Sequence, residues 1–357
     1  MKVVIVGGVA GGATAAARIR RLDENAKITV FEKSGYVSYA NCGLPYYIGG
    51  AITDPEELTL QTPESFKSRF QIDVRVRHEV TSVDTKKKTV KVKNLSTGEE
   101  FEESYDKLIL SPGAKPVKPA MTGVDTDRVF ILRTVEDTLR IHKFIAENDV
   151  KSAVIAGGGY IGLEMAENLT EKGISVTIVQ RPNQVMAPLD YDMACQLHGL
   201  LRKKGITLKF GSSVTGFEEK DGLILTTLKD DEPLKSDLVI LAIGVTPDTA
   251  LAKDAGLALG IKGSITVNER METSAPDVYA VGDAVQVKNF VTGEDALISL
   301  AGPANKQGRI AADNICGLKS SYDGSQGSSV IKIFDMTAAT TGINEKTAKQ
   351  LGIDYDK

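Results

Sequence analysis

The pattern of apolar and polar residues repeats one arrangement at two distant places in the chain. Each copy begins with a short apolar run, rich in β-branched residues, which predicts a buried strand. A helical pattern and a second apolar strand follow. The strand, helix and strand are expected at residues 2–6, 13–22 and 28–31 in the first copy, and at 153–156, 163–172 and 175–179 in the second.

A glycine cluster joins the first strand to the helix in each copy. Residues 7–12 read GGVAGG and residues 157–162 read GGGYIG. Glycine lets the backbone approach phosphates, and the following helix directs its N-terminal amides at them. The repeat therefore predicts two βαβ units and two dinucleotide sites, although Val9 stands where the first cluster would have its middle glycine.

The end of the second strand distinguishes the two sites. Glu32 lies there in the first copy, and a carboxylate at this place can accept bonds from ribose hydroxyls. The second copy has Gln180 and Arg181 instead. Since an arginine can pair with a 2′-phosphate, we expect NADPH to be accepted as well as NADH; alternatively, Arg181 is an exposed residue at a strand end.

The remaining segments complete an α/β pattern. Alternating residues over 74–92 and 100–110 predict hairpin strands, and proline and glycine near residues 111–119 and 244–247 predict chain crossings between domains. Further strands are expected at residues 277–281 and 330–334, and further helices at 192–204, 303–315 and 344–351.

The expected fold class is α/β, with two Rossmann-like dinucleotide-binding domains. Residues 1–112 and 245–322 are expected to form the first domain, and residues 113–244 the second. Residues 323–357, with one expected strand and one short helix, are expected to begin a truncated third domain of the α+β type, because so short a segment cannot bury a core alone.

Composition and charge limit the function classes. The 357-residue chain is 42% hydrophobic and 25% charged, with a net charge of −4. That charge offers no general attraction to nucleic acid, and no apolar run is long enough for a bilayer, so we expect neither partner. Three scattered cysteines without a CxxC predict no disulfide framework and no metal site, and they fit a reducing cytoplasm.

Cys42 is the candidate nucleophile. Ser38 and Asn41 before it are helix-capping residue types, and Pro45 after it suits a first helical turn. We therefore expect Cys42 at a helix N-terminus, where the dipole favours thiolate over thiol. Cys195 is expected to be a packing residue, and Cys316, at a helix C-terminus, is expected to be inert.

These motifs resemble the pyridine nucleotide–disulfide oxidoreductase family. Within it, the sequence is most similar to the single-cysteine branch of coenzyme A disulfide reductases, NAD(P)H-dependent persulfide reductases and NADH oxidases. The likeness covers essentially the whole chain. It is carried by Ser38–Gly50 (SYANCGLPYYIGG), Leu110–Ala114 (LSPGA), Leu132–Thr138 (LRTVEDT), Gly157–Glu164 (GGGYIGLE), Leu241–Pro247 (LAIGVTP), Tyr279–Asp283 (YAVGD) and Leu300–Arg309 (LAGPANKQGR).

The resemblance implies FAD at the first glycine cluster and NADPH or NADH at the second. Cys42 would be the redox centre beside the flavin. Tyr160 would lie over the flavin face until nicotinamide displaces it, with Glu164 nearby. The cofactor-binding positions implied in this way are Gly7, Gly8, Val9, Ala10, Gly11, Gly12, Glu32, Lys33, Asn41, Val80, Ser111, Pro112, Gly113, Gly157, Gly159, Tyr160, Ile161, Gly162, Glu164, Arg181, Gly244, Gly282, Asp283, Pro303 and Ala304.

More specific roles follow for some of these positions. Asp283 would bind the ribityl chain of FAD, and Pro303 and Ala304 would present amides to the pyrimidine edge of the flavin. Positions that contact coenzyme A in the reductases are matched by Thr14, Arg18, Arg21, Ser38 and Asn41. Arg18 and Arg21 lie three apart on one helical face, so both could reach the nucleotide phosphates of coenzyme A; otherwise they are solvated helix charges.

Two departures from the family pattern sort its branches. Tyr47 occupies the position of the second cysteine in the dithiol members, so Cys42 must bond a substrate sulfur or become a sulfenic acid. Ala10 replaces the histidine of the peroxidases and many oxidases.

Coenzyme A disulfide is accordingly the first expected substrate. Coenzyme A persulfide or polysulfide is second, and NADH oxidase activity is third. A redox-responsive flavoprotein that signals through a partner is the non-enzymatic alternative. The resemblance also implies a homodimer for the full-length protein, whose interface domain this chain only begins.

Overall fold

The computed structural model describes residues 1–356, and contacts divide the chain into two units. Unit 1 comprises residues 1–40, 59–115 and 246–327, and unit 2 comprises residues 41–58, 116–245 and 328–357. Each unit contains a five-stranded sheet in which every strand pairing is parallel. The expected α/β class with two Rossmann-like domains is therefore confirmed.

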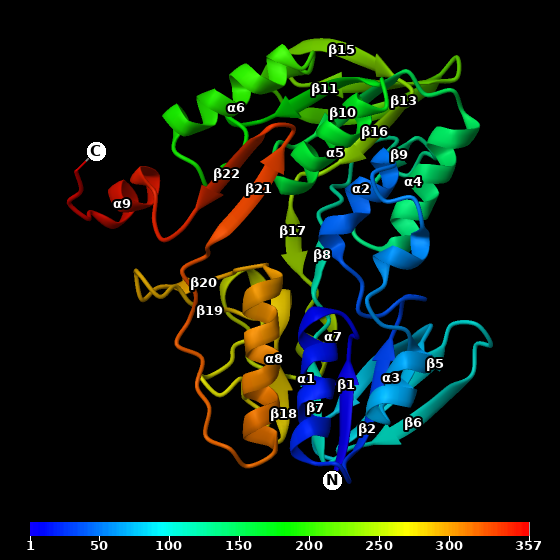
Figure 1. Cartoon of the computed structure of the whole chain (residues 1–357), viewed down its shortest axis with the longest axis vertical. Helices are drawn as coiled ribbons and strands as arrows, with labels where there is room; N and C mark the ends of the chain where they lie inside the picture. Colours follow the sequence, from blue (N-terminus) through cyan, green and yellow to red (C-terminus); the bar gives the residue numbers. More distant parts are fainter. Residues whose placement is uncertain (357) are drawn as a thin grey trace. The chain divides into compact units, whose positions relative to one another are not determined.

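Unit 1 is built on a sheet of order β18-β7-β1-β2-β3. Val3, Val4 and Ile5 are fully buried, as expected for a parallel strand covered on both faces. Helices α1 and α8 pack together beside this sheet (Figure 1). The strands are β18 (Val278–Ala280), β7 (Lys107–Leu110), β1 (Lys2–Val6), β2 (Lys27–Glu32) and β3 (Asp73–Val76), and the helices are α1 (Ala10–Leu22), α3 (Pro63–Phe70), α7 (Ala250–Asp254) and α8 (Ala301–Ile315).

The predicted hairpins of unit 1 are only partly correct. The antiparallel sheet consists of β4 (His78–Asp84), β5 (Thr89–Asn94) and β6 (Glu100–Ser104). In contrast, β3 and β7 belong to the parallel sheet, where they pair with β2 and β1. The signal against a hairpin in β7 was its continuous apolar run, because its Leu108–Leu110 segment is fully buried.

Unit 2 repeats this arrangement around the order β12-β11-β10-β16-β9. Its antiparallel sheet is inserted between β12 and β16, as that of unit 1 is inserted between β3 and β7. The parallel strands are β9 (Val129–Phe130), β10 (Ser152–Ala156), β11 (Ser175–Gln180), β12 (Thr207–Phe210) and β16 (Leu238–Leu241); the antiparallel strands are β13 (Val214–Lys220), β14 (Leu223–Leu228) and β15 (Asp231–Ser236); the helices are α2 (Leu44–Gly49), α4 (Val135–Glu147), α5 (Tyr160–Glu171) and α6 (Tyr191–Lys203).

The C-terminal segment also packs within unit 2. It contains β21 (Ser329–Ile333), β22 (Met336–Thr340) and α9 (Glu345–Leu351). Ile331 and Ile333 are buried, and β21 packs on α5. Thus residues 41–58 and 328–357, which the sequence assigned to the first domain and to a separate domain, belong to unit 2, where α2 packs on α4 and α5 and β21 packs on α5.

Short elements complete the chain. They are η1 (Asn41–Gly43), η2 (Pro55–Leu58), β8 (Ala114–Pro116), β17 (Val245–Pro247), η3 (Ile261–Gly263), η4 (Gly282–Ala284), β19 (Val287–Lys288) and β20 (Asp295–Ala296). Strands β8 and β17 pair where the chain passes between the units. Among the described residues, we find no helix with the length and apolar character needed to cross a membrane.

Candidate functional site

The first glycine loop, residues 7–12, has a backbone that only glycine can form. Gly7 has φ +93°, and a Cβ there would lie 2.1 Å from the Ser111 carbonyl oxygen. A Cβ on Gly12 would lie 1.9 Å from the Gly7 carbonyl oxygen. These close approaches bring the end of β1, the start of α1 and the segment after β7 together at the carboxyl edge of the sheet.

Glu32 is anchored to this loop. The carboxylate is buried, its Oε2 accepts a bond from the Gly8 amide at 2.8 Å, and its Oε1 accepts one from the Ser34 amide at 2.9 Å. In unit 2 the Oε1 of Gln180 accepts the equivalent bond from the Gly158 amide at 3.0 Å. Both strand-end residues therefore fix a glycine loop, one with a charged group and the other with a neutral one.

The second glycine loop, residues 157–162, uses its glycines for separate purposes. A Cβ on Gly157 (φ +111°) would lie 2.2 Å from the Ala242 carbonyl oxygen, and one on Gly162 would lie 2.0 Å from the Gly157 carbonyl oxygen. Gly159 differs, because no described atom lies within 4 Å of its ideal Cβ position. Protein packing does not require glycine at 159, and its missing side chain leaves space for a ligand.

The helices that follow the glycine loops lack a side-chain N-cap, a feature that they share with α2, α6 and α7. Thr62 of α3 and Thr134 of α4 close full capping boxes. The N-cap residues of α1, α5 and α8 provide no side-chain cap, so protein side chains do not occupy the first-turn amides of these helices. Open amides beside glycine loops fit the pyrophosphate of a dinucleotide in each unit.

Residues from three elements of unit 1 adjoin the first loop. Ser111 follows β7 and donates its amide to the Val6 carbonyl at 2.8 Å. Asp283 lies in η4, directly after β18. The Gly282 amide donates to Oε1 of Gln307 at 2.7 Å, and Gln307 is 1% exposed. Sequence reasoning missed Gln307, whose signal was an amide side chain on the buried face of an otherwise alanine-rich helix.

The expected amide role of Pro303 and Ala304 is wrong. Helix α8 begins at Ala301, earlier than predicted, so Pro303 lies within its first turn. Proline has no N–H, and the Ala304 amide already donates to the Leu300 carbonyl at 3.2 Å. The amides without an intrahelical acceptor at this end belong to Ala301 and Gly302 instead.

Other predicted cofactor positions of unit 1 are dispersed. The Ser38 amide donates to the Gly8 carbonyl at 2.9 Å, which places Ser38 beside the first loop. Lys33 is exposed and forms an ion pair of 3.2 Å with Asp248. Val80 lies in β4 and is packed in the core. Pro112 and Gly113 follow Ser111 between β7 and β8. In unit 2, Ile161 lies in the first turn of α5, and Gly244 directly precedes β17.

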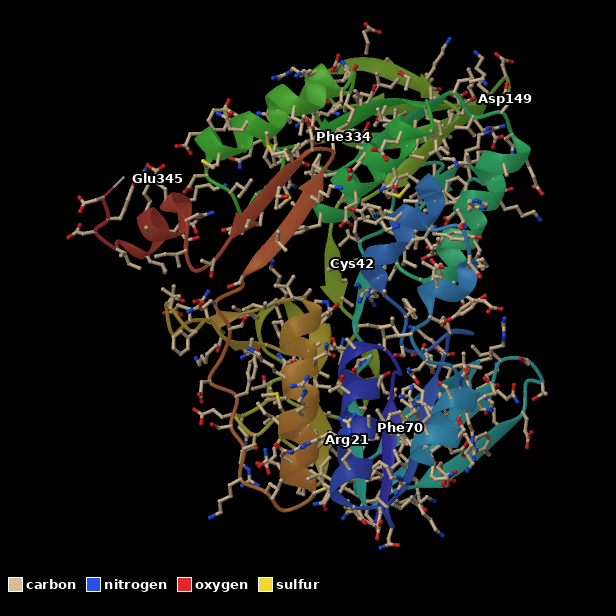
Figure 2. All side chains as sticks on the ribbon, viewed as in Figure 1. Arg21, Cys42, Phe70, Asp149, Phe334 and Glu345 are labelled. Carbon is tan, nitrogen blue, oxygen red and sulfur yellow. The ribbon has the colours of Figure 1, made fainter. Side chains whose placement is uncertain are left out.

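Cys42 lies in η1, directly before α2, and is exposed (Figure 2). Burial raises the pKa of the Cys42 thiol, the charge of Glu164 raises it further, and a backbone hydrogen bond only partly opposes them. The prediction of a thiolate stabilised by a helix dipole is therefore wrong for the polypeptide alone. Burial is the largest of these causes, and helix α2 has only six residues.

The helix that faces α2 in unit 2 is unusually acidic along one side. Glu164 and Glu167 lie on α5, and α2 and α5 pack closely at Gly49, where a Cβ would lie 2.0 Å from Oδ1 of Asn168. Burial, and then the charge of Glu167, raise the pKa of Glu164 to about 7. Tyr160 begins α5, and its hydroxyl is hydrogen-bonded to the hydroxyl of Ser329.

The remaining two cysteines are less accessible than Cys42. Cys195 lies in α6, and Cys316 is the C-cap residue of α8. Burial raises the pKa of the Cys316 thiol, and the charges of Asp23 and Asp313 raise it further. This direction agrees with the prediction that Cys316 is inert, but burial rather than the helix dipole is the leading cause.

The predicted coenzyme A positions of unit 1 already have protein partners. The Thr14 hydroxyl donates to Asn305 at 2.8 Å, and Nε of Arg18 pairs with Asp313 at 2.7 Å. Arg21 is exposed, with its guanidinium carbon 6.0 Å from the Phe70 ring centroid (Figure 2). Asn41 belongs to η1 of unit 2 and is exposed.

Comparison with known proteins decides the family. The model of the family described as "Pyridine nucleotide-disulphide oxidoreductase" matches residues 1–308. The chain belongs to this family. Its members use FAD together with NADH or NADPH, in agreement with the two glycine loops.

Individual relatives show which members of the family the chain resembles. A coenzyme A disulfide reductase of Staphylococcus haemolyticus is 37% identical over 355 residues, which are 99% of this chain and 79% of the relative. The structure of reduced Bacillus anthracis CoADR-RHD is 50% identical, with a TM-score of 0.97 over 99% of this chain and 64% of that one. A NAD-dependent persulfide reductase from A. fulgidus is 37% identical, with a TM-score of 0.96 over 99% of this chain and 66% of that one.

The chain therefore resembles both disulfide and persulfide reductases over nearly its full length. It spans slightly less than two thirds of the two solved relatives. Family, fold and cofactor classes follow from these matches, whereas the substrate and the activity of the whole protein are proposals.

Proposed function

We propose that the protein is an NAD(P)H-dependent flavoprotein reductase that reduces coenzyme A disulfide through Cys42. The observation that carries this proposal is the position of one exposed cysteine directly before α2, with Tyr47 in place of any second cysteine in that helix. A lone thiol of this kind can form no internal disulfide, so it either exchanges with an external sulfur, as proposed here, or is oxidised to sulfenic acid.

Residues of each unit would hold one cofactor. In unit 1, the amides at the start of α1 would bind the FAD pyrophosphate, Glu32 would accept from the adenosine ribose, and Asp283 would contact the ribityl chain. In unit 2, the start of α5 would bind the nicotinamide nucleotide. FAD, when bound, would pass the electrons of NADH or NADPH on towards sulfur.

Cys42 would carry out the exchange in two balanced steps. Its thiolate attacks one sulfur of the disulfide, forms a mixed disulfide and releases one coenzyme A thiolate, which takes up a proton. Two electrons and one proton then cleave the mixed disulfide, restoring the Cys42 thiolate and releasing the second coenzyme A thiol. Because burial and Glu164 raise the pKa of Cys42, the thiolate needs stabilisation that the polypeptide alone does not provide.

Arg18 and Arg21 support the choice of coenzyme A. Both lie on α1, and Arg21 is exposed. Each would make charge-assisted bonds to coenzyme A phosphates, which glutathione lacks, worth about 1.5–3 kcal/mol. Arg18 would have to share its guanidinium with Asp313, so Arg21 is expected to contribute the larger part.

NADPH should be accepted at least as well as NADH. Gln180 places no negative charge near the ribose, and the next residue, Arg181, is exposed at the end of β11. Exposure reduces what a phosphate contact with Arg181 would contribute. Gln180 can still bond ribose hydroxyls, so NADH should also react.

A persulfide of coenzyme A is the second candidate substrate. The persulfide reductase relative matches 99% of this chain, and the same exposed cysteine could accept the outer sulfur. The two substrates leave different masses on Cys42: a coenzyme A adduct for the disulfide, and one added sulfur for the persulfide.

The decisive experiment compares native protein with Cys42→Ser. The variant should retain flavin and its reduction by NADPH but lose reduction of coenzyme A disulfide, whereas Cys195→Ser and Cys316→Ser should keep full activity. Mass spectrometry after incubation with each sulfur substrate should find the adduct on Cys42. Full disulfide reductase activity in Cys42→Ser would refute the mechanism, and equal rates with coenzyme A disulfide and glutathione disulfide would refute the substrate.

A further inference from the structure

The segment that follows β11, residues 181–190, rests directly on the second glycine loop. The Met186 amide donates to the Gly158 carbonyl at 2.8 Å. A Cβ on Gly158 would lie 2.7 Å from Cγ1 of Val185, so the two segments touch without space for a side chain. Any movement of residues 181–190 would therefore release one side of the glycine loop.

This segment does not hold its conformation by local preference. Met186 has φ +50°, a left-handed backbone conformation that costs a non-glycine residue free energy. Most of its other residues, including Arg181, are exposed. Its shape must therefore be maintained by contacts with neighbouring elements.

Two buried polar side chains, Gln184 and His198, bond the part of residues 181–190 that faces the protein interior. Gln184 is 5% exposed, and its Nε2 donates to the Leu189 carbonyl at 3.0 Å. The Val185 amide donates to Nε2 of His198 on α6 at 3.2 Å. Gln180, which also accepts from Gly158, donates to the Gln184 carbonyl at 3.2 Å. The glycine loop, the strand end and the segment thus form one hydrogen-bonded group.

The outer side is held by α9, far along the chain. Nζ of Lys346 donates to the Ala187 carbonyl at 2.8 Å, and Nδ2 of Asn344 donates to the Pro188 carbonyl at 3.1 Å. The Glu345 amide donates to Oδ1 of Asp190 at 3.0 Å (Figure 2 labels Glu345).

The Asp190 side chain bonds α9 and not its own helix. Asp190 occupies the N-cap position of α6, yet its side chain makes no capping bond to that helix. Its carboxylate accepts from the first residue of α9 instead. A residue type that ordinarily caps its own helix is used here to dock another one.

We propose that α9 positions the adenosine end of the nicotinamide nucleotide site, with Lys346 and Asp190 as positioning residues that keep residues 181–190 against Gly158. The inference rests on the proposed binding of a nicotinamide nucleotide in unit 2. The segment after the second strand of a Rossmann βαβ unit meets the adenosine ribose. When a fraction of the molecules has this segment undocked, the apparent dissociation constant equals the intrinsic constant divided by the docked fraction, while bound nucleotide reacts as before.

The test uses flavin-loaded full chain and two ligands, ADP-ribose and NADPH. The variants are Lys346→Met, which keeps the apolar stem, and Lys346→Met combined with Asp190→Ala. Lys349→Met is the matched control, because Nζ of Lys349 pairs with Glu345 at 2.8 Å and also bonds Tyr355, both in the C-terminal segment and neither in residues 181–190. Titration calorimetry measures affinity, and hydrogen exchange measures protection of residues 183–190.

The double variant should bind both ligands about three- to tenfold more weakly, with faster exchange in residues 183–190 and an unchanged kcat at saturating NADPH. Lys346→Met should show a smaller effect in the same direction, and Lys349→Met should match the native chain. Faster exchange with unchanged affinity would overturn the inference, as would a lower kcat with unchanged affinity. If the double variant fails to fold, Lys346→Met at an exposed position decides by the same criteria. Absence of ADP-ribose binding by the native chain would instead refute the nucleotide assignment itself.

Discussion

The two glycine loops have the same backbone demands but present different chemistry. Gly7 and Gly157 both have positive φ, and both would drive a Cβ into a carbonyl oxygen. The side chains at the strand ends make equivalent bonds to the loops, yet Glu32 is an acid and Gln180 is neutral. The two loops therefore share one backbone, and the side chains around them differ in charge.

The helices after the loops, α1 and α5, also carry a neutral and an ionisable side chain at equivalent positions. Glu164 of α5 and Thr14 of α1 both lie seven residues after the first glycine of their loop. Thr14 is bonded to Asn305, whereas Glu164 is a partly buried acid whose pKa is raised to about 7. Unit 2 thus has an ionisable group on its nucleotide-proximal helix where unit 1 has a neutral one.

Replacing one loop glycine with alanine should abolish cofactor binding at that loop alone. Of the predictions made here, this one has the largest expected effect. Gly7→Ala would bring its Cβ to 2.1 Å from a carbonyl oxygen, and Gly157→Ala to 2.2 Å, in a φ region that alone costs alanine about 1–2 kcal/mol. Gly7→Ala should lose FAD, seen as loss of flavin absorbance after gel filtration. Gly157→Ala should keep FAD but lose its reduction by NADPH. Loss of flavin from both variants to the same degree would show that the sites are not independent.

Replacing Glu164 of α5 should remove part of the pH dependence of the free energy of unfolding. Helix α1 has the neutral Thr14 at the equivalent position. The pKa of Glu164 is higher in the folded protein than in the unfolded chain, so its contribution to stability is present at low pH and is lost as pH rises from about 4.5 to about 7. Glu164→Gln should therefore raise the free energy of unfolding above pH 7 by up to about 3 kcal/mol relative to native protein.

Urea denaturation at pH 5 and pH 8 measures this difference. The matched control is Glu171→Gln, an exposed residue at the C-terminal end of the same helix, which should leave the pH dependence unchanged. Parallel pH profiles for native protein and Glu164→Gln would contradict the burial of this carboxyl group.

Giving β11 the same strand-end acid as β2 should change the preference between NADPH and NADH, and this effect should be smaller than the two effects above. Gln180→Glu would restore the acid that unit 1 carries at Glu32 and place a negative charge near a 2′-phosphate. The ratio of kcat/KM for NADPH to that for NADH should fall about tenfold. Arg181→Ala should lower the same ratio by less, because Arg181 is exposed. An unchanged ratio in Gln180→Glu would mean that this position does not meet the ribose.

Much of this site could be predicted because its signals are local in the chain. Glycine at fixed spacing, an apolar strand before it and a strand-end residue such as Glu32 are all features of a few consecutive residues. The position of Cys42 before a short helix was also predictable from Pro45. The hairpin expectation for residues 107–110 failed because alternation was assumed where a continuous apolar run indicated burial on both faces.

The sequence by itself determined the repeated βαβ units, their two glycine loops and the position of Cys42 before a short helix, because backbone conformation and hydrophobic period depend on residues that are close together in the chain. Only the tertiary structure decided the state of the groups in the site. Burial and the charge of Glu164, from a helix more than a hundred residues away, reverse the expected pKa direction of Cys42. The docking of Lys346 on the segment after β11 likewise joins distant residues. Electrostatic interactions and hydrogen bonds between distant segments depend on distances in space, which a pattern along the chain does not specify.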